Sequence, residues 1–307
     1  MINLLKKFKN ILSDKGINAV IYKTDNYIYL NDKNVKIRIA NNSYINDLFD
    51  PLDNYEYYRY NELLKAKKVS CDYYEENLQE FLNIPVYYGA ELPCVKLSSN
   101  HYNEVCNNAY IFDGYLWIID SSYLLRHVLP EKTKKEVKLN IPNLIYNLFS
   151  KIDYIKQSEN YVQIFGLINK QTYITIEYKM LFELDKNISL IKGVSKPLDI
   201  CDDGVIYDLN EVYNLKLSSK KQENLIKYND GIISVKNLKF NHIKEIAIHN
   251  EFKNILKPFT VDFYYLNKFK KLFKNAFIKA YNTISGNQFQ ITMNKGKNAM
   301  ILMCFRD

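Results

Sequence analysis

Two carboxylates and a lysine near the middle of the chain have the types and spacing that could support phosphodiester hydrolysis. Glu177 and Lys179 flank a single residue at the end of a run that alternates like a β-strand, and Asp153 lies upstream. Carboxylates of this kind hold Mg²⁺, and a lysine beside the attacking water assists the displacement. These three residues therefore support one enzyme hypothesis, a metal-dependent nuclease.

The nuclease match is incomplete, because only the E-x-K part of the PD-(D/E)xK pattern is present. Asp153 follows Ile152 where the pattern has proline, and E-x-K arises easily by chance in a chain with 42 lysines and arginines. The four histidines (His101, His127, His242 and His249) lack metal-ligand spacing, and the five cysteines form no C-x-x-C pair. No glycine-rich nucleotide motif and no G-x-S-x-G element occurs. We therefore expect no cofactor, and the nuclease remains the alternative.

Lysines on two predicted helices indicate a different chemistry. Near the N-terminus, Leu4, Leu5 and Phe8 form an apolar stripe at helical spacing. Residues 266–276 repeat this stripe near the C-terminus. The opposite faces carry Lys6, Lys7, Lys9, Lys268, Lys271 and Lys274. A lysine-rich helix face is most often simply solvated. Repeated on similar helices, it also fits a positive surface that meets a phosphate backbone.

The elements that would position these lysines recur along the chain. Residues 259–263 alternate like a strand, the helical stripe follows, and residues 289–293 and 299–305 form two further strands. A looser copy begins near residue 137, with a strand, a helical stripe over residues 144–152 and strands at 161–168 and 172–178. Another begins near residue 3. Such repetition predicts α+β domains with antiparallel sheets.

Length and composition set the remaining bounds. The 307 residues suit two or three domains, and we place three, at 1–89, 90–183 and 184–307. A net charge of +8 favours an acidic partner such as nucleic acid. No signal peptide or apolar run of the ~20 residues that cross a bilayer is present, so we expect a cytoplasmic protein with no membrane partner and reduced thiols.

Residues 41–89 are the hardest part of the chain to interpret. Their tyrosine cluster at 55–60 fits either a platform for stacking bases or a packed patch, and the packed patch is the simpler interpretation. Heavy use of Lys, Asn, Ile and Tyr indicates an AT-rich genome, such as that of a phage, a virus or a low-GC bacterium.

Three segments resemble the DNA sliding clamps, the polymerase processivity factors of bacteria and their viruses (the β-subunit type of DNA polymerase III). In residues 109–124, Asp120 and Leu124 match a threonine-aspartate-glycine-x-arginine-leucine turn, from which Ile119, Ser121 and Tyr123 depart. Residues 137–178 are similar to the second half of the clamp's middle domain. Residues 259–305 are similar to its closing unit, with DFYYL at 262–266 where an FN-x-x-YL start is usual.

The resemblance implies a ring without an active site, in which helices line the hole and antiparallel sheets form the rim. Such a ring encircles duplex DNA without sequence preference, is placed there by a clamp loader and tethers a DNA polymerase. A homodimer is expected, with a trimer as the alternative. The resemblance places the six lysines toward the hole and a pocket for partner peptides at Tyr123, Leu124 and Met303. A third hypothesis is a non-enzymatic viral interaction protein that does not bind DNA.

Overall fold

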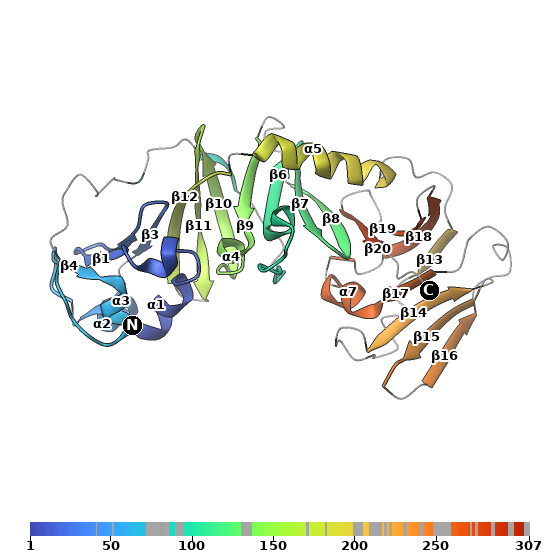
Figure 1. Cartoon of the computed structure of the whole chain (residues 1–307), viewed down its shortest axis with the longest axis horizontal. Helices are drawn as coiled ribbons and strands as arrows, with labels where there is room; N and C mark the ends of the chain where they lie inside the picture. The colour runs from blue at the N-terminus through green and yellow to red at the C-terminus, as the bar shows by residue number, and fades with distance from the viewer. Residues whose placement is uncertain are drawn as a thin grey trace. The chain divides into compact units, whose positions relative to one another are not determined.

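The chain folds into two compact units of antiparallel β-structure (Figure 1). Unit 1 contains Met1–His101, Asn107–Gly114 and Leu129–Leu184, and unit 2 contains Tyr102–Cys106, Tyr115–Val128 and Asp185–Asp307. The division into three domains stays a prediction. The computed structural model describes residues 1–40, 42–50, 52–71, 81, 86–89, 92, 95–129, 137–169, 172–181, 183–198, 205–208, 217, 220, 223–229, 232–239, 242–247, 259–270, 272–273, 276–283, 286–293 and 298–303.

Unit 1 is built on an eight-stranded sheet, sheet A, in the order β4-β1-β2-β3-β12-β11-β10-β5. Its strands are β1 (Val20–Lys23), β2 (Tyr27–Asn31), β3 (Val35–Ala40), β4 (Tyr57–Arg59), β5 (Val86–Gly89), β10 (Lys151–Gln157), β11 (Tyr161–Asn169) and β12 (Thr172–Lys179). Unit 1 also contains β6 (Asn108–Phe112), which pairs with β9 (Leu139–Pro142). The helices are α1 (Ile2–Phe8), α2 (Ser43–Phe49), α3 (Tyr60–Leu64), α4 (Asn143–Tyr146) and the 3₁₀ turn Ser13–Gly16.

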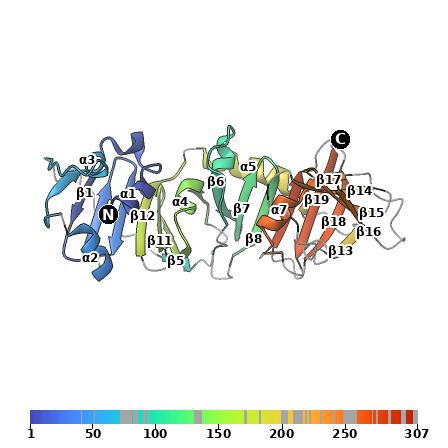
Figure 2. The ribbon, with the colours of Figure 1, turned by 90° about the horizontal axis from the view of Figure 1, so that it is seen from below.

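Unit 2 contains two sheets (Figure 2). Among its described strands, sheet B runs β13-β18-β19-β20-β8-β7 and sheet C runs β16-β15-β14-β17. The strands are β7 (Tyr115–Asp120), β8 (Tyr123–Val128), β13 (Val205–Asp208), β14 (Asn224–Asn229), β15 (Ile232–Asn237), β16 (His242–Ala247), β17 (Phe259–Asp262), β18 (Ala276–Thr283), β19 (Gly286–Met293) and β20 (Asn298–Met303). The helices are α5 (Leu184–Ser195), α7 (Phe263–Lys268) and the 3₁₀ turns Glu104–Asn107 and Lys196–Leu198.

The predicted repeat is present, and its second and third copies have one more strand than expected. Three short helices, α1, α4 and α7, are each followed by an antiparallel meander: β1-β2-β3, β10-β11-β12 and β18-β19-β20. In unit 1 the last strands of two meanders pair with each other, and in unit 2 the last strand of one meander pairs with the second strand of the β7-β8 hairpin. These junctions are β3 with β12 in unit 1 and β20 with β8 in unit 2.

Alternation of side chains places the core on one face of sheet A. Ile21, Ile28, Ile37 and Ile176 are fully buried, whereas the intervening side chains are mostly half-buried. Because successive side chains of a strand point to opposite faces, these isoleucines share a single apolar surface. Helix α1 adds Leu5 and Phe8, both fully buried, to the core.

The helical stripe predicted over residues 144–152 was wrong. Helix α4 ends at Tyr146, and Ile152 belongs to β10. The register of β10 against β11 shifts between Ile152 and Tyr154, so Asp153 is an extra residue in a β-bulge. The bulge puts Ile152 and Ile155 on the same buried face although they are three residues apart, which imitates helical spacing.

The C-terminal helix is also shorter than predicted. Helix α7 ends at Lys268, and Ala276, which we placed in its apolar stripe, is the first residue of β18. Turns that follow the helix carry Phe269 and Phe273 into the core, both fully buried. Strands β8 and β14 and helix α5 were not predicted. The sequence also predicts a helix over residues 73–82, a range that lies almost entirely outside the described residues.

Gly166 offers a test of the bulge, because a Cβ there would overlap the backbone of Lys151 and Ile152 on β10. We expect Gly166→Ala to lower the free energy of unfolding by about 1–3 kcal/mol, since a packed backbone must move. Urea denaturation followed by circular dichroism measures the change. Gly193→Ala is the matched control, because a Cβ there meets nothing within 4 Å. Equal stability of the two variants would contradict this bulge geometry.

Candidate nucleic-acid and partner interface

Helix α1 presents the first group of predicted DNA-binding lysines. Leu4, Leu5 and Phe8 are buried, and the Tyr60 hydroxyl donates a hydrogen bond of 2.7 Å to the Leu5 carbonyl. This contact and the apolar stripe determine which side of the helix faces the core. Lys6, Lys7 and Lys9 are consequently exposed.

The second predicted group begins at Lys268, whose surroundings differ from those of the first group. Lys268 is half-buried, and its Nζ donates a hydrogen bond of 3.1 Å to the Tyr123 hydroxyl. The amine also lies 5.0 Å from the Tyr123 ring centre and 5.4 Å from that of Phe269. Lys268 is thus held against β8, whereas the neighbouring Lys270 is exposed. Lys271 and Lys274 lie outside the described residues.

The residues predicted to form a peptide pocket start β8 and end β20. Tyr123 is 1% exposed and Leu124 is fully buried, and Leu124 lies opposite Ile301 of β20. Met303 is the last residue of β20. In the turn before β8, one Asp120 carboxylate oxygen accepts hydrogen bonds from the Ser122 N–H and the Ser121 hydroxyl. Tyr123 and Leu124 therefore pack as core residues in this structure.

Aromatic rings from α7 and the turn after it surround Tyr123. The centres of the Tyr265 and Phe269 rings lie 5.6 and 4.9 Å from that of Tyr123. Burial, followed by the charge of Asp120, raises the pKa of the Tyr123 hydroxyl. The sequence identified Lys268 as a basic residue of a predicted helix. Its contact with Tyr123 could not be predicted, because the two residues are 145 positions apart in the sequence.

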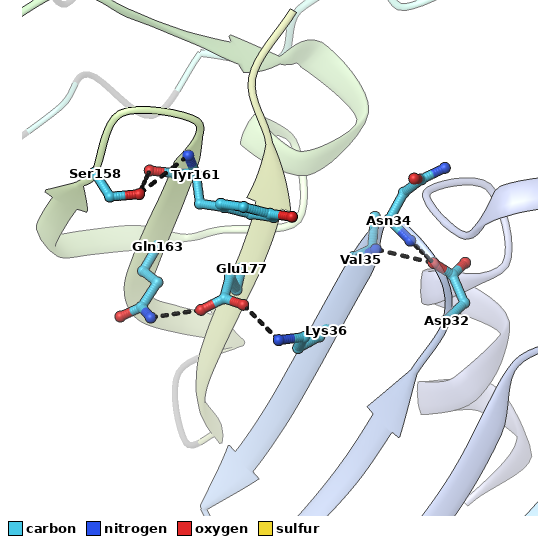
Figure 3. A network of polar contacts seen from close by, with 8 residues as sticks. All are labelled: Asp32, Asn34, Val35, Lys36, Ser158, Tyr161, Gln163 and Glu177. Atoms are coloured by element: carbon cyan, nitrogen blue, oxygen red, sulfur yellow. Dashed lines mark hydrogen bonds and ion pairs between the residues drawn. The ribbon is translucent and has the colours of Figure 1, made fainter. Parts of the chain in front are cut away.

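The carboxylate of the hypothetical nuclease site lies inside a polar network on sheet A (Figure 3). Glu177 is 1% exposed, and one of its oxygens lies 2.9 Å from the Nζ of Lys36. The other accepts a hydrogen bond of 2.6 Å from the Gln163 side chain. These contacts follow from register, because Glu177 of β12 lies opposite Gln163 of β11 and Lys36 of β3.

Asp153 does not join Glu177 in this network. It forms an ion pair of 2.6 Å with Lys151 in the bulge of β10, whereas the β10 residue opposite Gln163 is Lys156. Within the described ranges, no group of three or more histidine, cysteine, aspartate or glutamate residues is placed to hold a metal ion. Glu177 therefore serves as the partner of Lys36 and Gln163 in the sheet.

We compared the chain with protein-family models, curated proteins and solved structures. No protein-family model and no curated protein matches the chain. Among solved structures, it is similar to DNA polymerase III subunit beta from Borrelia burgdorferi, with 13% identity and a TM-score of 0.60 over 100% of this chain and 96% of that one.

Two further structures agree. A sliding clamp (DNA polymerase III subunit beta) from Pseudomonas aeruginosa has 10% identity and a TM-score of 0.57, and the Helicobacter pylori β clamp has 12% and 0.56. Each match covers 100% of this chain and 97% of the other. The chain therefore has the sliding-clamp fold, which confirms the α+β repeated architecture expected from the resemblance. None of the described helices is long and apolar enough to cross a membrane.

Substitution of Glu177 tests whether this carboxylate stabilises the sheet or takes part in the hypothetical nuclease reaction. We expect Glu177→Ala to lower the free energy of unfolding by about 3–5 kcal/mol, because Lys36 loses its partner in a mostly buried site. Asp153→Ala breaks a more exposed pair and should cost about 0–1 kcal/mol. Urea denaturation measures both. If the wild type cleaved DNA in the presence of Mg²⁺, and both variants lost this cleavage while remaining folded, the result would support the nuclease instead.

Alkaline titration tests the burial of Tyr123. Burial raises the pKa of Tyr123 in the folded state, so the stability gained from its neutral ring is complete below the ordinary tyrosine pKa of about 10 and is lost as the pH rises above it. Tyr123→Phe should therefore reduce the decline of stability above pH ~10, as seen in urea midpoints. Tyr102, fully exposed, supplies the control Tyr102→Phe, which should leave the decline unchanged. If the stability of Tyr123→Phe declined above pH ~10 as steeply as that of the wild type, the result would contradict the burial of the Tyr123 hydroxyl.

Proposed function

We propose that this chain is a DNA sliding clamp, a processivity factor that encircles duplex DNA and tethers a DNA polymerase. The observation that carries the proposal is the clamp fold over the whole chain, matched at 96–97% of the length of DNA polymerase III beta subunits. The exposed Lys6, Lys7 and Lys9 on α1 support it, because phosphate contacts without base contacts give an attraction that permits sliding.

The remaining parts of the proposal follow from a clamp's task. The chain would act without catalysis, in the cytoplasm of a bacterium or an infected cell, and a clamp loader would place it on DNA. Tethering makes each rebinding of the polymerase intramolecular and so raises its effective concentration. An origin in a phage or a low-GC bacterium also remains part of the proposal.

Ring closure by a homodimer, with a trimer as the alternative, requires two different surfaces that meet between copies. Strand β4 stands at one end of sheet A, and β16 stands at one end of sheet C. Among the described strands, β16 has β15 as its single neighbour and so offers backbone groups on its other side. The outer side of β4 is covered instead, because the Arg59 N–H donates to the Val69 carbonyl and the Cys71 N–H donates to the Tyr57 carbonyl. The edge of β16 suits the continuation of a sheet from one subunit into the next, and residues 69–71 would have to move for β4 to do the same.

The partner site at Tyr123, Leu124 and Met303 is proposed at the start of β8 and the end of β20. A peptide could reach the two buried residues only if Lys268 and the rings of Tyr265 and Phe269 move aside. The departures from the clamp turn at Ile119, Ser121 and Tyr123 agree with a partner peptide that differs from those of bacterial clamps.

Topology-dependent retention on DNA tests the proposal. After loading, or at high protein concentration, the protein should remain on nicked circular duplex DNA and be lost after the circle is cut, because an encircling ring slides off free ends. Light scattering at micromolar concentration should give the mass of a dimer or trimer of the 36.4 kDa chain. A monomer with equal retention on circular and linear DNA would contradict the clamp and leave the non-DNA interaction protein.

Charge substitutions on α1 test the DNA-facing surface. Replacing Lys6, Lys7 and Lys9 by glutamine should weaken duplex binding and reduce the slope of log K against log salt by about 0.9 for each phosphate that the protein no longer neutralises. Exposed lysines outside the predicted DNA-facing group, Lys33, Lys179 and Lys196, provide a control triple variant with the same change in charge. Equally weakened binding in the two variants would show that α1 has no special role.

A further inference from the structure

The face of sheet A opposite the isoleucine core carries a line of seven side chains, five of them aromatic, that crosses seven strands. Register places each residue directly opposite the next: Tyr57, Tyr22, Tyr29, Arg38, Thr175, Phe165 and Tyr154. We call this line the aromatic row. At about 4.8 Å between strands it spans on the order of 29 Å. Its rings are half-buried, so they remain accessible in part.

The rings of the row are organised into stacks. Tyr22 and Tyr29 are stacked with ring centres 4.7 Å apart. Tyr154, Phe165 and the adjacent Tyr173 form a second stack, with spacings of 4.7 and 5.3 Å and interplanar angles of 16° and 10°. Tyr173 ends this stack and is 40% exposed. A further planar ring placed beyond Tyr173 would continue the stack.

Two cations lie against the rings near the row. The Arg38 guanidinium is 4.9 Å from the ring centre of Tyr27 and 4.8 Å from that of Phe81, and the Lys156 amine is 5.6 Å from that of Tyr154. The carboxylate of Asp153 also acts on Tyr154, but it is paired with Lys151 at 2.6 Å. The acidic residue in the neighbouring line, Glu177, is buried against Lys36. An approaching ligand therefore meets stacked rings with two cations among them.

A second cluster in unit 2 has the same local geometry and serves as an internal comparison. Tyr115 and Trp117 of β7 pack edge to face at 5.7 Å and 65°, and Tyr27 and Tyr29 of β2 do so at 5.9 Å and 64°. Arg126 of β8 lies 5.0 Å from Tyr115, as Arg38 lies 4.9 Å from Tyr27. Trp117, however, is only 4% exposed. The unit 2 cluster thus lacks the accessible ring stack.

We propose that the aromatic row, ending at Tyr173, binds single-stranded nucleic acid, with bases stacked on the rings and phosphates near Arg38 and Lys156. Sheet faces that bind single strands combine these two features, and the binding tolerates any sequence because every base has a π-face. Duplex DNA does not fit, because its bases are already stacked and paired. This site is separate from encirclement of duplex DNA and does not depend on ring formation.

Fluorescence anisotropy with a labelled oligothymidine of about 15 nucleotides, a length within the usual site sizes, tests the proposal. Such a short strand has free ends and cannot be retained by encirclement. Tyr173→Ala should weaken binding about five- to tenfold, the effect expected for one stacked base. Tyr173→Phe keeps the ring and should bind like the wild type. An abasic strand of equal length should bind more weakly than oligothymidine.

Arg38→Gln and Arg126→Gln form a matched pair, because each removes one positive charge and two cation–π contacts. The first should weaken binding and lower the salt slope by about 0.7, and the second should leave both unchanged. The proposal would be overturned if the two arginine substitutions had equal effects on binding. It would also be overturned if abasic and normal strands bound equally, or if Tyr173→Ala bound oligothymidine as tightly as the wild type. Stronger competition by a glutamate–tyrosine copolymer than by oligothymidine would overturn it in favour of an acidic protein segment. Tyr173→Ala should keep wild-type retention on circular duplex DNA, which separates this site from the clamp function.

Discussion

Backbone pairing between the last strand of a meander and a strand from a distant part of the chain is the interaction on which the rest of each unit depends. In unit 1, β3 pairs with β12 over five residue pairs, from Val35 with Tyr178 to Ile39 with Ile174. In unit 2, β20 pairs with β8 in the same way. Without these junctions, each meander would keep only three strands and a short helix, which is close to the minimum for a stable sheet. With them, separate stretches of the chain share one core.

The junction register also determines what each face of sheet A can do. A shift by one residue would exchange the two faces of β12 and bring Glu177 into the isoleucine core. In the observed register, Glu177 meets Lys36 and Gln163, and the line two residues further along becomes the aromatic row. A polar line and an aromatic line thus lie next to each other on the face away from the core. The same constraint accounts for both the polar partners of Glu177 and the proposed single-strand site.

Much of the fold could be predicted where a strand lies regularly in its sheet. The clean alternation of residues 35–40 predicts a strand, and these residues form β3. The dipeptide Asp113-Gly114 predicts a hairpin turn, and both residues have the positive φ that a tight turn requires. Prediction failed where local spacing misled, as at the bulge around Asp153. The candidate site was less predictable still. The exposure of Lys6 follows from helical periodicity, but the burial of Lys268 against Tyr123 depends on a partner far away in the sequence.

The junction in unit 1 also has a consequence for synthesis on the ribosome. Strand β3 ends at Ala40, whereas its partner β12 ends at Lys179, 139 residues later. At about 5–20 residues per second, the nascent chain carries β3 with one side unpaired for roughly 7–28 s. An open strand edge is a template for association with other chains. Neighbouring nascent chains on one messenger RNA therefore present the same edge at the same time, and chaperones that cover hydrophobic strands would act on this protein chiefly during that interval.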